Sequence, residues 1–545
     1  MLLRSAAIAL GAIALFALPS ASLAAAGTAL DAPPPNLTPT TATLGSILAA
    51  HDKAVGTLPA SVKNTVAETW TFVDQGLKGT LSLERDGTNY RSRIAAGPFV
   101  EQYGQDASGR WHQDANGFTT STTAVDEESF YPIRVVEDAA DPKNDVTVLG
   151  ESAGQSPAYV LKVVRPGYEH PEYVFYDKAS AMVTRVEIPT RQRRIVQTYS
   201  DFRTTDGVAA AWHVHDTDGR PELDDDYVLT SLRHGEDFPA QDFAMPPYHP
   251  SIGRVTVRTP IAAHTLGYGY LVRMNVGGRG LDFIVDSSSP DSIVDRDVAR
   301  EMNLPAYGQA TQTTDGKPVA YRTTIADGDV SGIPFHNFVL TAEPFGWEPD
   351  DRTKIVGALG YDFFAANVLH FDFMNGTLEA LPVAPFSAGA PVPGGYDIPI
   401  QIDDGTPFVP IAIGSFITRK ALLSTADPIT MVFGSFVYAH PDQLQDPPGS
   451  GRHHPGRIVP FADEGTYGIT VESWTSMVSD LRFAVGDYQR VGLLSTNYPL
   501  RLHEQDVDAL LGLDYLGFYD LYFAYPYGRF IVKPNAAFFK VFKRD

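Results

Sequence analysis

The most constraining feature of this sequence is an internal repeat in its second half. Residues 270–286 (YLVRMNVGGRGLDFIVD) align without gaps on residues 408–424 (FVPIAIGSFITRKALLS). Both copies are typical of a strand, a turn and a second strand, followed by a polar loop that ends at Pro290 or Pro428. Two copies of one β unit predict a domain of two lobes related by a pseudo-twofold axis.

The repeat continues beyond these strands. Gly360-Tyr-Asp-Phe-Phe aligns with Gly512-Leu-Asp-Tyr-Leu, and each copy then reaches a matching glycine, Gly376 or Gly528, in an expected hairpin turn. The segment between the copies is rich in Pro, Ala and Gly, which is typical of a linker. The expected boundaries are 255–380 for the first lobe, 381–396 for the linker and 397–545 for the second lobe.

Residues 1–26 have the pattern of a cleaved signal peptide. Arg4 gives a positive start, residues 6–18 are apolar apart from one glycine, and several small residues then offer cleavage sites. The apolar run is shorter than the roughly 20 residues that a spanning helix needs, and no later run is long enough. Since no cysteine follows, a bacterial lipoprotein is excluded. We therefore expect an exported protein, periplasmic or secreted, that is not an integral membrane protein.

Composition excludes several functional classes. The formal net charge of −23 argues against binding to nucleic acid or to an anionic membrane surface. The absence of cysteine excludes disulfides, thiol nucleophiles and cysteine-ligated metals. No cofactor and no metal are expected. A chain of 545 residues with 43% hydrophobic residues is expected to fold into several globular domains.

The first half has the pattern of an antiparallel sheet. After a Pro- and Thr-rich linker at 27–43 and a helix over 44–54, strands alternate in polarity from about Val66. Residues 80–84 and 90–94 flank Asp-Gly, which predicts a hairpin. Strand 173–176 is expected to pair with 182–188 in the same way. This β domain is expected over 44–250, because prolines then interrupt the pattern.

The order of these elements, together with the glycine- and aspartate-rich run at 104–117 (GQDASGRWHQDANG), resembles the half-barrel of periplasmic lipoprotein carriers and outer-membrane lipoprotein-sorting proteins. The resemblance implies a curved antiparallel sheet that cups an acyl chain. It therefore implies a lipid-like ligand for the first half of the chain.

The strongest chemical motif lies at 281–304 (LDFIVDSSSPDSIVDRDVAREMNL). An apolar strand delivers Asp286 into a loop of small hydroxyl residues, and a short strand and a helix follow. With the later Ile355–Gly360 segment (IVGALG), this order resembles the retropepsin-like, or pepsin-like, aspartic peptidases. The fold class expected for the whole chain is therefore mainly β: an N-terminal half-barrel followed by a two-lobed, pseudo-twofold, aspartic-peptidase-like domain.

The resemblance also implies a mechanism. Two carboxylates a few ångströms apart share one proton, because two like charges so close cannot both ionise. One carboxyl activates a water as a base while the other, protonated, polarises the scissile carbonyl. Each lobe of such a peptidase supplies one aspartate, and the hydroxyl after it links the two loops.

The sequence departs from this pattern. Asp286 and Ser287 fit, but Ser288 replaces the usual glycine. In the second copy the aligned triplet begins with Ser424 and Thr425, so the hydroxyl is kept and the carboxylate is missing. Asp427 is offset by three residues, and we expect its side chain to point elsewhere. The predicted site residues are Asp286, Ser287, Ser424 and Thr425.

Two interpretations of Asp286 remain open: a retained site residue, and a carboxylate that only stabilises its turn. They correspond to two functions. The first is a degenerate aspartic endopeptidase with weak or absent activity, either as a monomeric pseudo-dimer or through pairing of first lobes from two chains. The second is a non-catalytic binding or carrier protein for a polypeptide or lipid-like ligand.

Three other segments have weaker signals. His213 and His215 alternate on one strand near two aspartates and could hold a metal, although such pairs are more often on a surface strand. Residues 453–454 (His-His) are expected in a solvated loop. Asp315-Gly316 fits the tip of a flap over the cleft, or of a plain hairpin.

Overall fold

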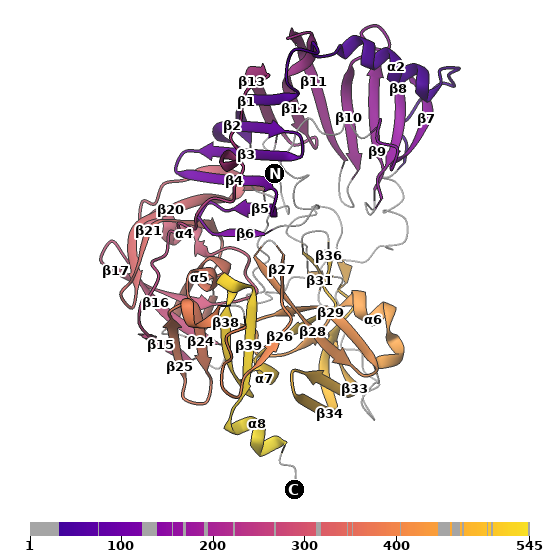
Figure 1. The fold of residues 1–545 in the computed structure, drawn as a ribbon. Helices are drawn as coiled ribbons and strands as arrows, with labels where there is room; N and C mark the ends of the chain where they lie inside the picture. The colour runs from indigo at the N-terminus through magenta and orange to yellow at the C-terminus, as the bar shows by residue number, and fades with distance from the viewer. Residues whose placement is uncertain are drawn as a thin grey trace. The chain divides into compact units, whose positions relative to one another are not determined.

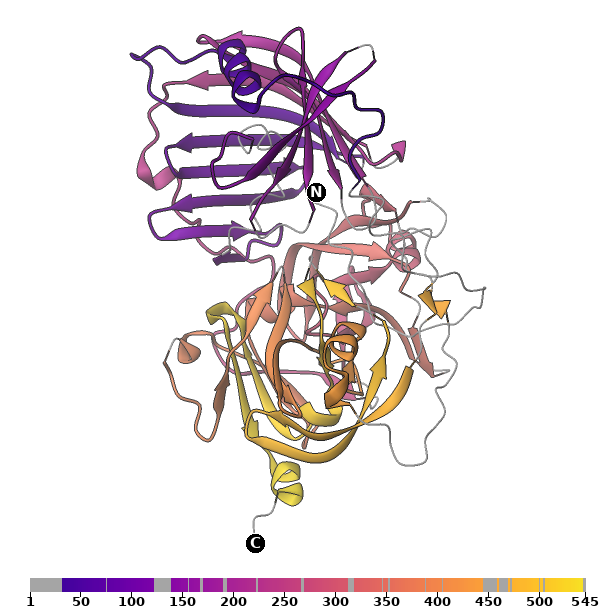
Figure 2. The same cartoon turned by 90° about the vertical axis from the view of Figure 1, so that its right-hand side faces the viewer.

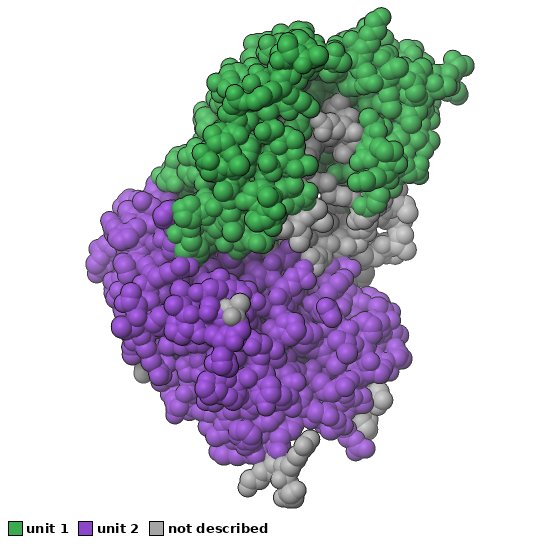
Figure 3. Space-filling view, viewed as in Figure 1, with its two compact units in different colours: residues 1–4, 21–248, 307–318 green, residues 5–20, 249–306, 319–545 purple. Residues whose placement is uncertain are grey.

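A computed structural model describes most of the chain. The described residues are 32–542, except 75, 122–138, 155, 167–169, 190–193, 222–223, 266–268, 312–317, 346, 351–352, 388, 404, 445–457, 460–468, 471–472, 499 and 503–504. They fall into two compact units, 32–248 with 307–318 and 249–306 with 319–542 (Figure 3). Within the described residues, no helix has the length and apolar character to span a bilayer.

The first unit is built on one antiparallel sheet. Its described strands follow the order β6-β5-β4-β3-β2-β1-β13-β12-β11-β10-β9-β8-β7, so all neighbours but β1 and β13 are also consecutive in sequence (Figures 1 and 2). The elements are α2 (Leu44–Val55), β1 (Thr65–Asp74), β2 (Leu77–Asp86), β3 (Asn89–Ala96), β4 (Phe99–Asp106), β5 (Gly109–Gln113), β6 (Thr119–Ser121), β7 (Asp145–Ser152), β8 (Ala158–Val164), β9 (Glu172–Asp177), β10 (Val183–Pro189), β11 (Arg194–Thr205), β12 (Val208–Thr217), β13 (Asp225–His234), η3 (Ala240–Asp242) and β19 (Tyr307–Thr311).

One face of this sheet is apolar across β1, β2 and β3. The strand register sets Trp70, Leu81 and Ile94 side by side on that face, and all three are buried. Alternate residues of a strand point to the same side, so the sequence alternation becomes a continuous buried surface. Helix α2 packs on this face further along the sheet, where the His51 and Tyr176 rings meet edge-to-face at 5.1 Å.

The second unit contains two lobes with one topology. The sheet order is β15-β16-β17-β23-β18-β21-β20 in the first lobe and β27-β28-β29-β37-β30-β34-β33 in the second. The first lobe comprises β14 (Thr259–Ile261), β15 (Ala263–Thr265), β16 (Tyr270–Val276), β17 (Arg279–Val285), β18 (Ile293–Asp295), α4 (Arg296–Glu301), β20 (Pro318–Val330), β21 (Ile333–Glu343), β22 (Trp347–Asp350), β23 (Thr353–Leu359), α5 (Tyr361–Ala366), β24 (Val368–Asp372), β25 (Thr377–Leu381) and η4 (Ala384–Phe386).

The second lobe comprises β26 (Tyr396–Ile398), β27 (Gln401–Asp403), β28 (Thr406–Ile413), β29 (Phe416–Leu423), β30 (Met431–Val432), α6 (Gly434–Ala439), η5 (Pro441–Gln443), β31 (Ile458–Val459), β32 (Ile469–Thr470), β33 (Ser473–Phe483), β34 (Gly486–Thr496), β35 (Arg501–Leu502), β36 (Gln505–Asp506), β37 (Ala509–Leu511), α7 (Leu513–Leu516), β38 (Tyr519–Ala524), η6 (Tyr525–Tyr527), β39 (Arg529–Pro534) and α8 (Ala536–Val541). The matching strand orders confirm the repeat that the sequence predicted.

A third sheet joins the two lobes. Its order is β14-β25-β24-β38-β39-β26, so three strands come from each lobe and the pseudo-twofold relation passes between β24 and β38. The partner of the first lobe at this edge is therefore the second lobe of the same chain. A pairing of first lobes from two chains would have to displace β38.

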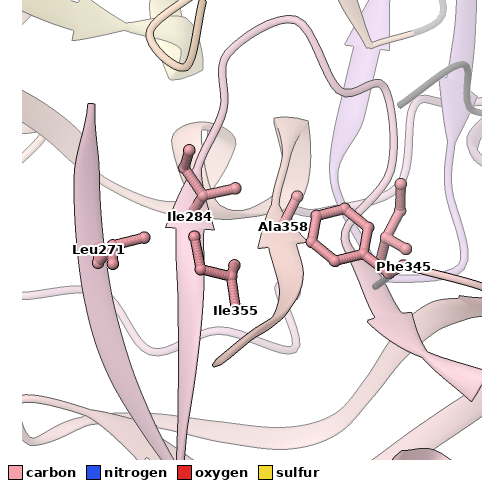
Figure 4. Close-up of a cluster of buried hydrophobic side chains, with 6 residues drawn as sticks. Leu271, Ile284, Phe345, Ile355 and Ala358 are labelled. Carbon is pink, nitrogen blue, oxygen red and sulfur yellow. The ribbon is translucent and has the colours of Figure 1, made fainter. Parts of the chain in front are cut away.

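Each lobe also has a matching hydrophobic core beneath its loop. In the first lobe Leu271, Ile284, Phe345, Ile355 and Ala358 pack with Ile293 (Figure 4). In the second lobe the cluster includes Leu422 and Leu510, which align with Ile284 and Ala358 in the repeat. These side chains fix the strands that lead into the two polar loops.

The mainly β fold class, with a large N-terminal antiparallel sheet and two C-terminal lobes, is therefore confirmed. The predicted helix at 44–54 and both predicted hairpins are also present, as α2, β2–β3 and β9–β10. The predicted signal peptide, the Asp315-Gly316 turn and residues 453–454 lie outside the described residues.

Candidate active site

Two equivalent strands deliver the two candidate loops. β17 ends directly before Asp286 and runs parallel to β23, while β29 ends directly before Ser424 and runs parallel to β37. The Asp286 amide donates to the Leu359 carbonyl at 3.0 Å, and the Ser424 amide donates to the Leu511 carbonyl at 3.1 Å. The first residue of each loop is therefore fixed by the same backbone contact.

The two loops are hydrogen-bonded to each other. Ser287 Oγ donates to the Leu423 carbonyl at 2.7 Å, and Thr425 Oγ1 donates to the Val285 carbonyl at 2.8 Å. Thr425 Oγ1 also accepts the Ser287 amide at 3.0 Å. Ser287 and Thr425 are both fully buried. The structure thus brings together the four residues that the sequence singled out.

A second set of contacts supports each loop from behind. In the first lobe, the Ser292 amide donates to Asp362 at 3.0 Å, and Ser292 Oγ accepts the Gly360 amide. In the second, the Thr430 amide donates to Asp514 at 3.0 Å, and Thr430 Oγ1 likewise accepts the amide of the glycine at 512. These pairs align in the repeat, so the pseudo-symmetry extends to individual side chains.

Both glycines are needed for a close backbone approach. A Cβ at Gly360 would meet the carbonyls of Ser289 and Asp291, and one at Gly512 would meet the carbonyls of Asp427 and Ile429. Only a residue without a side chain fits there.

Asp286 is held by its own loop. Its Oδ1 accepts hydrogen bonds from the Ser288 amide at 2.9 Å and from Ser288 Oγ at 2.7 Å. Ser288, which replaces the expected glycine, therefore turns back onto the carboxylate. Burial raises the pKa of Asp286, and the hydrogen bonds from Ser288 and Ser424 oppose that shift.

Ser424 lies between two carboxyl groups. Its Oγ is 3.4 Å from Asp286 Oδ1 and 2.7 Å from Asp427 Oδ2. The prediction that Asp427 points elsewhere is wrong. The chain turns after Ser424, whose Oγ accepts the Ala426 and Asp427 amides at 3.3 and 3.1 Å, and such a turn returns the fourth residue to the first.

The two carboxyl groups interact electrostatically. Burial, and then the negative charge of Asp286, raise the pKa of Asp427 to about 7, while the hydrogen bond from Ser424 opposes the rise. Both aspartates keep part of their surface exposed, whereas Ser424 is fully buried between them. The site therefore holds a pair of carboxyls near neutral pH that cannot readily both be charged.

Tyr525 is a further member of the site that the sequence analysis missed. Its ring stacks on Tyr361, with centroids 6.1 Å apart, and its buried Oη has no hydrogen-bond partner among the described residues. Burial, followed by Tyr361 and Asp286, raises the pKa of the Tyr525 hydroxyl. The repeat could have pointed to Tyr525, because Tyr525 aligns with Phe373 and has a hydroxyl group that Phe373 lacks.

The histidine pair on β12 forms hydrogen bonds with a carboxylate. His213 Nε2 and His215 Nδ1 lie 2.9 and 3.1 Å from the same oxygen of Asp226 on β13. Within the described residues, no three histidine, aspartate or glutamate side chains are grouped so as to hold a metal ion.

The comparison with family models agrees with the position of the first loop. Residues 272–363 match the aspartyl protease family. The matched segment runs from β16 into α5, and it contains Asp286, Ser287 and the Ser292–Asp362 contact. The match lies within the first lobe.

Solved structures similar to parts of the chain are of two kinds. A LolA superfamily protein from Nitrosomonas europaea is 11% identical, with a TM-score of 0.29, covering 37% of this chain and 98% of its own. An aspartic proteinase from Irpex lacteus is 12% identical, with a TM-score of 0.30, covering 52% and 98%. A retropepsin-like aspartic protease from Rickettsia conorii is 16% identical, with a TM-score of 0.18, covering 24% and 93%. No curated protein matches the chain.

Proposed function

We propose that the second unit binds an extended polypeptide at the crossing of its two loops and hydrolyses it slowly, with Asp286 as the base that activates water. The observation that carries this proposal is the position of Asp286, which is partly exposed at the point where Ser287 and Thr425 cross-link the loops. A carboxylate that only capped a turn would not require a second loop to be locked against it.

The expected rate is low because of the group opposite Asp286. The aligned residue, Ser424, offers a hydroxyl, which can form a hydrogen bond but does not ionise near neutral pH. Positioned acids and bases each contribute about 10²–10⁴-fold to a rate. A weakened acid therefore predicts slow turnover rather than the loss of peptide binding.

The test is a comparison of the wild type with Asp286→Asn on an unfolded-protein or peptide-library substrate, with product detection sensitive to single turnovers. We expect slow cleavage by the wild type that Asp286→Asn abolishes, and similar peptide affinity for both. Asp487→Asn, at an exposed aspartate on β34, is the matched control and keeps wild-type activity. Equal activity of wild type and Asp286→Asn would overturn the proposal; binding without any cleavage would favour a non-catalytic peptide-binding protein.

A second function is favoured by the first unit. The face that carries Trp70, Leu81 and Ile94 is apolar over several strands, as a site for an acyl chain or similar ligand requires. The test is co-purified lipid, measured by mass spectrometry on wild type and Leu81→Lys, a change on the apolar face. The leader-like pattern of residues 1–26 supports export of the chain, which N-terminal sequencing of the periplasmic or secreted protein would test.

A further inference from the structure

We propose that Asp427 is the second carboxyl of this site and that the Ser424 hydroxyl joins it to Asp286, because acid and hydroxyl have exchanged places in the second loop. This inference rests on the proposed function of the Asp286 site and names the group that completes it. The sequence alignment alone shows only a missing aspartate at Ser424.

The exchange follows from the repeat. The first loop reads Asp286-Ser-Ser-Ser289, and the second reads Ser424-Thr-Ala-Asp427. The first and fourth positions therefore carry an acid and a hydroxyl in one loop, and a hydroxyl and an acid in the other.

The backbone confirms that the fourth positions are equivalent. The Ser289 carbonyl accepts the Tyr361 amide at 2.9 Å, and the Asp427 carbonyl accepts the Leu513 amide at 2.8 Å. Tyr361 directly follows Gly360, and Leu513 directly follows Gly512, the equivalent glycine of the second copy. Asp427 thus stands where the first lobe has Ser289, with its carboxyl turned towards Ser424 at the first position of its own loop.

The hydroxyl of Ser424 has a single proton to donate. It lies 2.7 Å from Asp427 and 3.4 Å from Asp286, so it donates to one carboxyl at a time. When Asp427 is charged, Ser424 donates to Asp427. When Asp427 is protonated it becomes a weaker acceptor, and the Ser424 hydroxyl turns to donate to Asp286 while Ser424 Oγ keeps the Ala426 and Asp427 amides as donors. One hydroxyl rotation therefore couples the protonation of the two groups.

The charges around the pair favour one shared proton. Among the described residues, Asp427 and Tyr525 each interact electrostatically with Asp286, and Tyr525 is neutral near pH 7 because burial raises its pKa. Burial, and then the negative charge of Asp286, keep the proton on Asp427 up to about pH 7. Where Asp286 is ionised and Asp427 is not, the resting site holds one carboxylate and one carboxylic acid.

These two carboxyl groups can supply every proton transfer that the hydrolysis of a peptide bond requires. Water oxygen bonds to the carbonyl carbon and gives its proton to Asp286, while the carbonyl oxygen takes a proton from Asp427, which is partly exposed. The C–N bond then breaks, the leaving nitrogen takes the proton from Asp286, and the new carboxyl returns a proton to Asp427. Both aspartates end in their starting states.

A direct test uses the full chain labelled with ¹³C at aspartate carboxyls, with the two resonances assigned from Asp286→Asn and Asp427→Asn. We expect the Asp427 resonance to titrate near pH 7 in the wild type and at least about 1 pH unit lower in Asp286→Asn, because the like charge is removed. Glu343→Gln, which removes a buried carboxyl from β21 of the first lobe, should leave the Asp427 titration unchanged. If the pKa of Asp427 were the same in the wild type and in Asp286→Asn, the inference would be overturned.

A second test measures activity in variants that remove Asp427 or reverse the exchange of acid and hydroxyl between positions 424 and 427. Asp427→Asn should lower turnover about 100-fold or more and remove the loss of activity above pH 7, whereas a merely structural Asp427 would leave the pH profile unchanged. The double variant S424D/D427S restores an acid at the first position and a hydroxyl at the fourth, and it should recover or exceed wild-type turnover. Wild-type turnover and pH profile in Asp427→Asn would contradict the inference.

The two sets of results separate the inference from the proposed function. If the carboxyls are coupled but no substrate is cleaved, the pair exists and the proposed hydrolysis is wrong. If Asp286-dependent cleavage occurs with uncoupled carboxyls, the proposed function stands and the exchange is wrong.

Discussion

Thr425 Oγ1 forms two hydrogen bonds to the backbone of the loop that carries Ser287: it accepts the Ser287 amide at 3.0 Å and donates to the Val285 carbonyl at 2.8 Å. Replacement by the isosteric valine would leave both buried groups without a partner. We expect Thr425→Val to destabilise the second unit by about 2–3 kcal/mol and Thr425→Ser to cost less than about 1 kcal/mol. Calorimetric unfolding of both variants checks this, and equal losses would point to packing rather than hydrogen bonding.

Glu343 at the end of β21 gives the second unit a pH-dependent stability. Burial, and then the charge of Asp291, raise its pKa to about 8. Because the folded state holds the proton more tightly than the unfolded chain, this contribution is fully present below about pH 4.5 and is lost as pH rises to about 8.

Glu343→Gln should therefore gain stability relative to the wild type as pH rises, by up to about 1.4 kcal/mol per pH unit over that window. The measurement is urea unfolding at pH 5 and pH 8.5, with Asp487→Asn as the exposed control. A difference between Glu343→Gln and wild type that does not change with pH would contradict the assignment.

Gly104 on β4 lies directly beneath a large side chain. A Cβ there would overlap the indole ring of Trp111 on β5, which is almost fully buried. We expect Gly104→Ala to destabilise the first unit by about 1–3 kcal/mol through overpacking. Gly45→Ala is the matched control, since its Cβ meets nothing within 4 Å and α2 should gain about 0.5 kcal/mol. The thermal unfolding of the two variants should shift in opposite directions.

Ser288→Gly removes one contact to the charged form of Asp286, because it deletes the Oγ donor and keeps the backbone amide. Since hydrogen bonds from Ser288 lower the pKa of Asp286, the variant should raise that pKa further. The acidic limb of the activity profile, where Asp286 must lose its proton, should move to higher pH. Measurement of kcat/KM against pH tests this, and a shift to lower pH would show that Ser288 does not stabilise the carboxylate.

Much of this architecture was predictable, because the repeat at 270–286 and 408–424 records both lobes in the sequence. The cross-links of Ser287 and Thr425 were expected from that alignment together with the resemblance to aspartic peptidases. The role of Asp427 did not follow from the alignment, because Asp427 is offset by three residues and in a strand such a residue lies on the opposite face. In a turn the fourth residue returns to the first, and a serine followed three residues later by aspartate was the available signal.

Tyr525 was missed for a different reason. It lies 239 positions along the chain from Asp286, outside any loop with a recognisable motif, and only the packing of η6 against α5 brings its ring to Tyr361. Contacts of this kind depend on how the third sheet joins the lobes, which no local pattern encodes.

The continuous sheet through β24 and β38 has a consequence for how this site could evolve. In an assembly of two identical chains, every mutation appears in both loops at once, so an acid moved from the first to the fourth position moves twice. Here the two loops are separate stretches of one gene product that remain bound edge to edge. Each loop can therefore change alone. A single mutation can give Asp286 and Asp427 different positions and different roles, whereas in a symmetric dimer the same mutation would alter both loops.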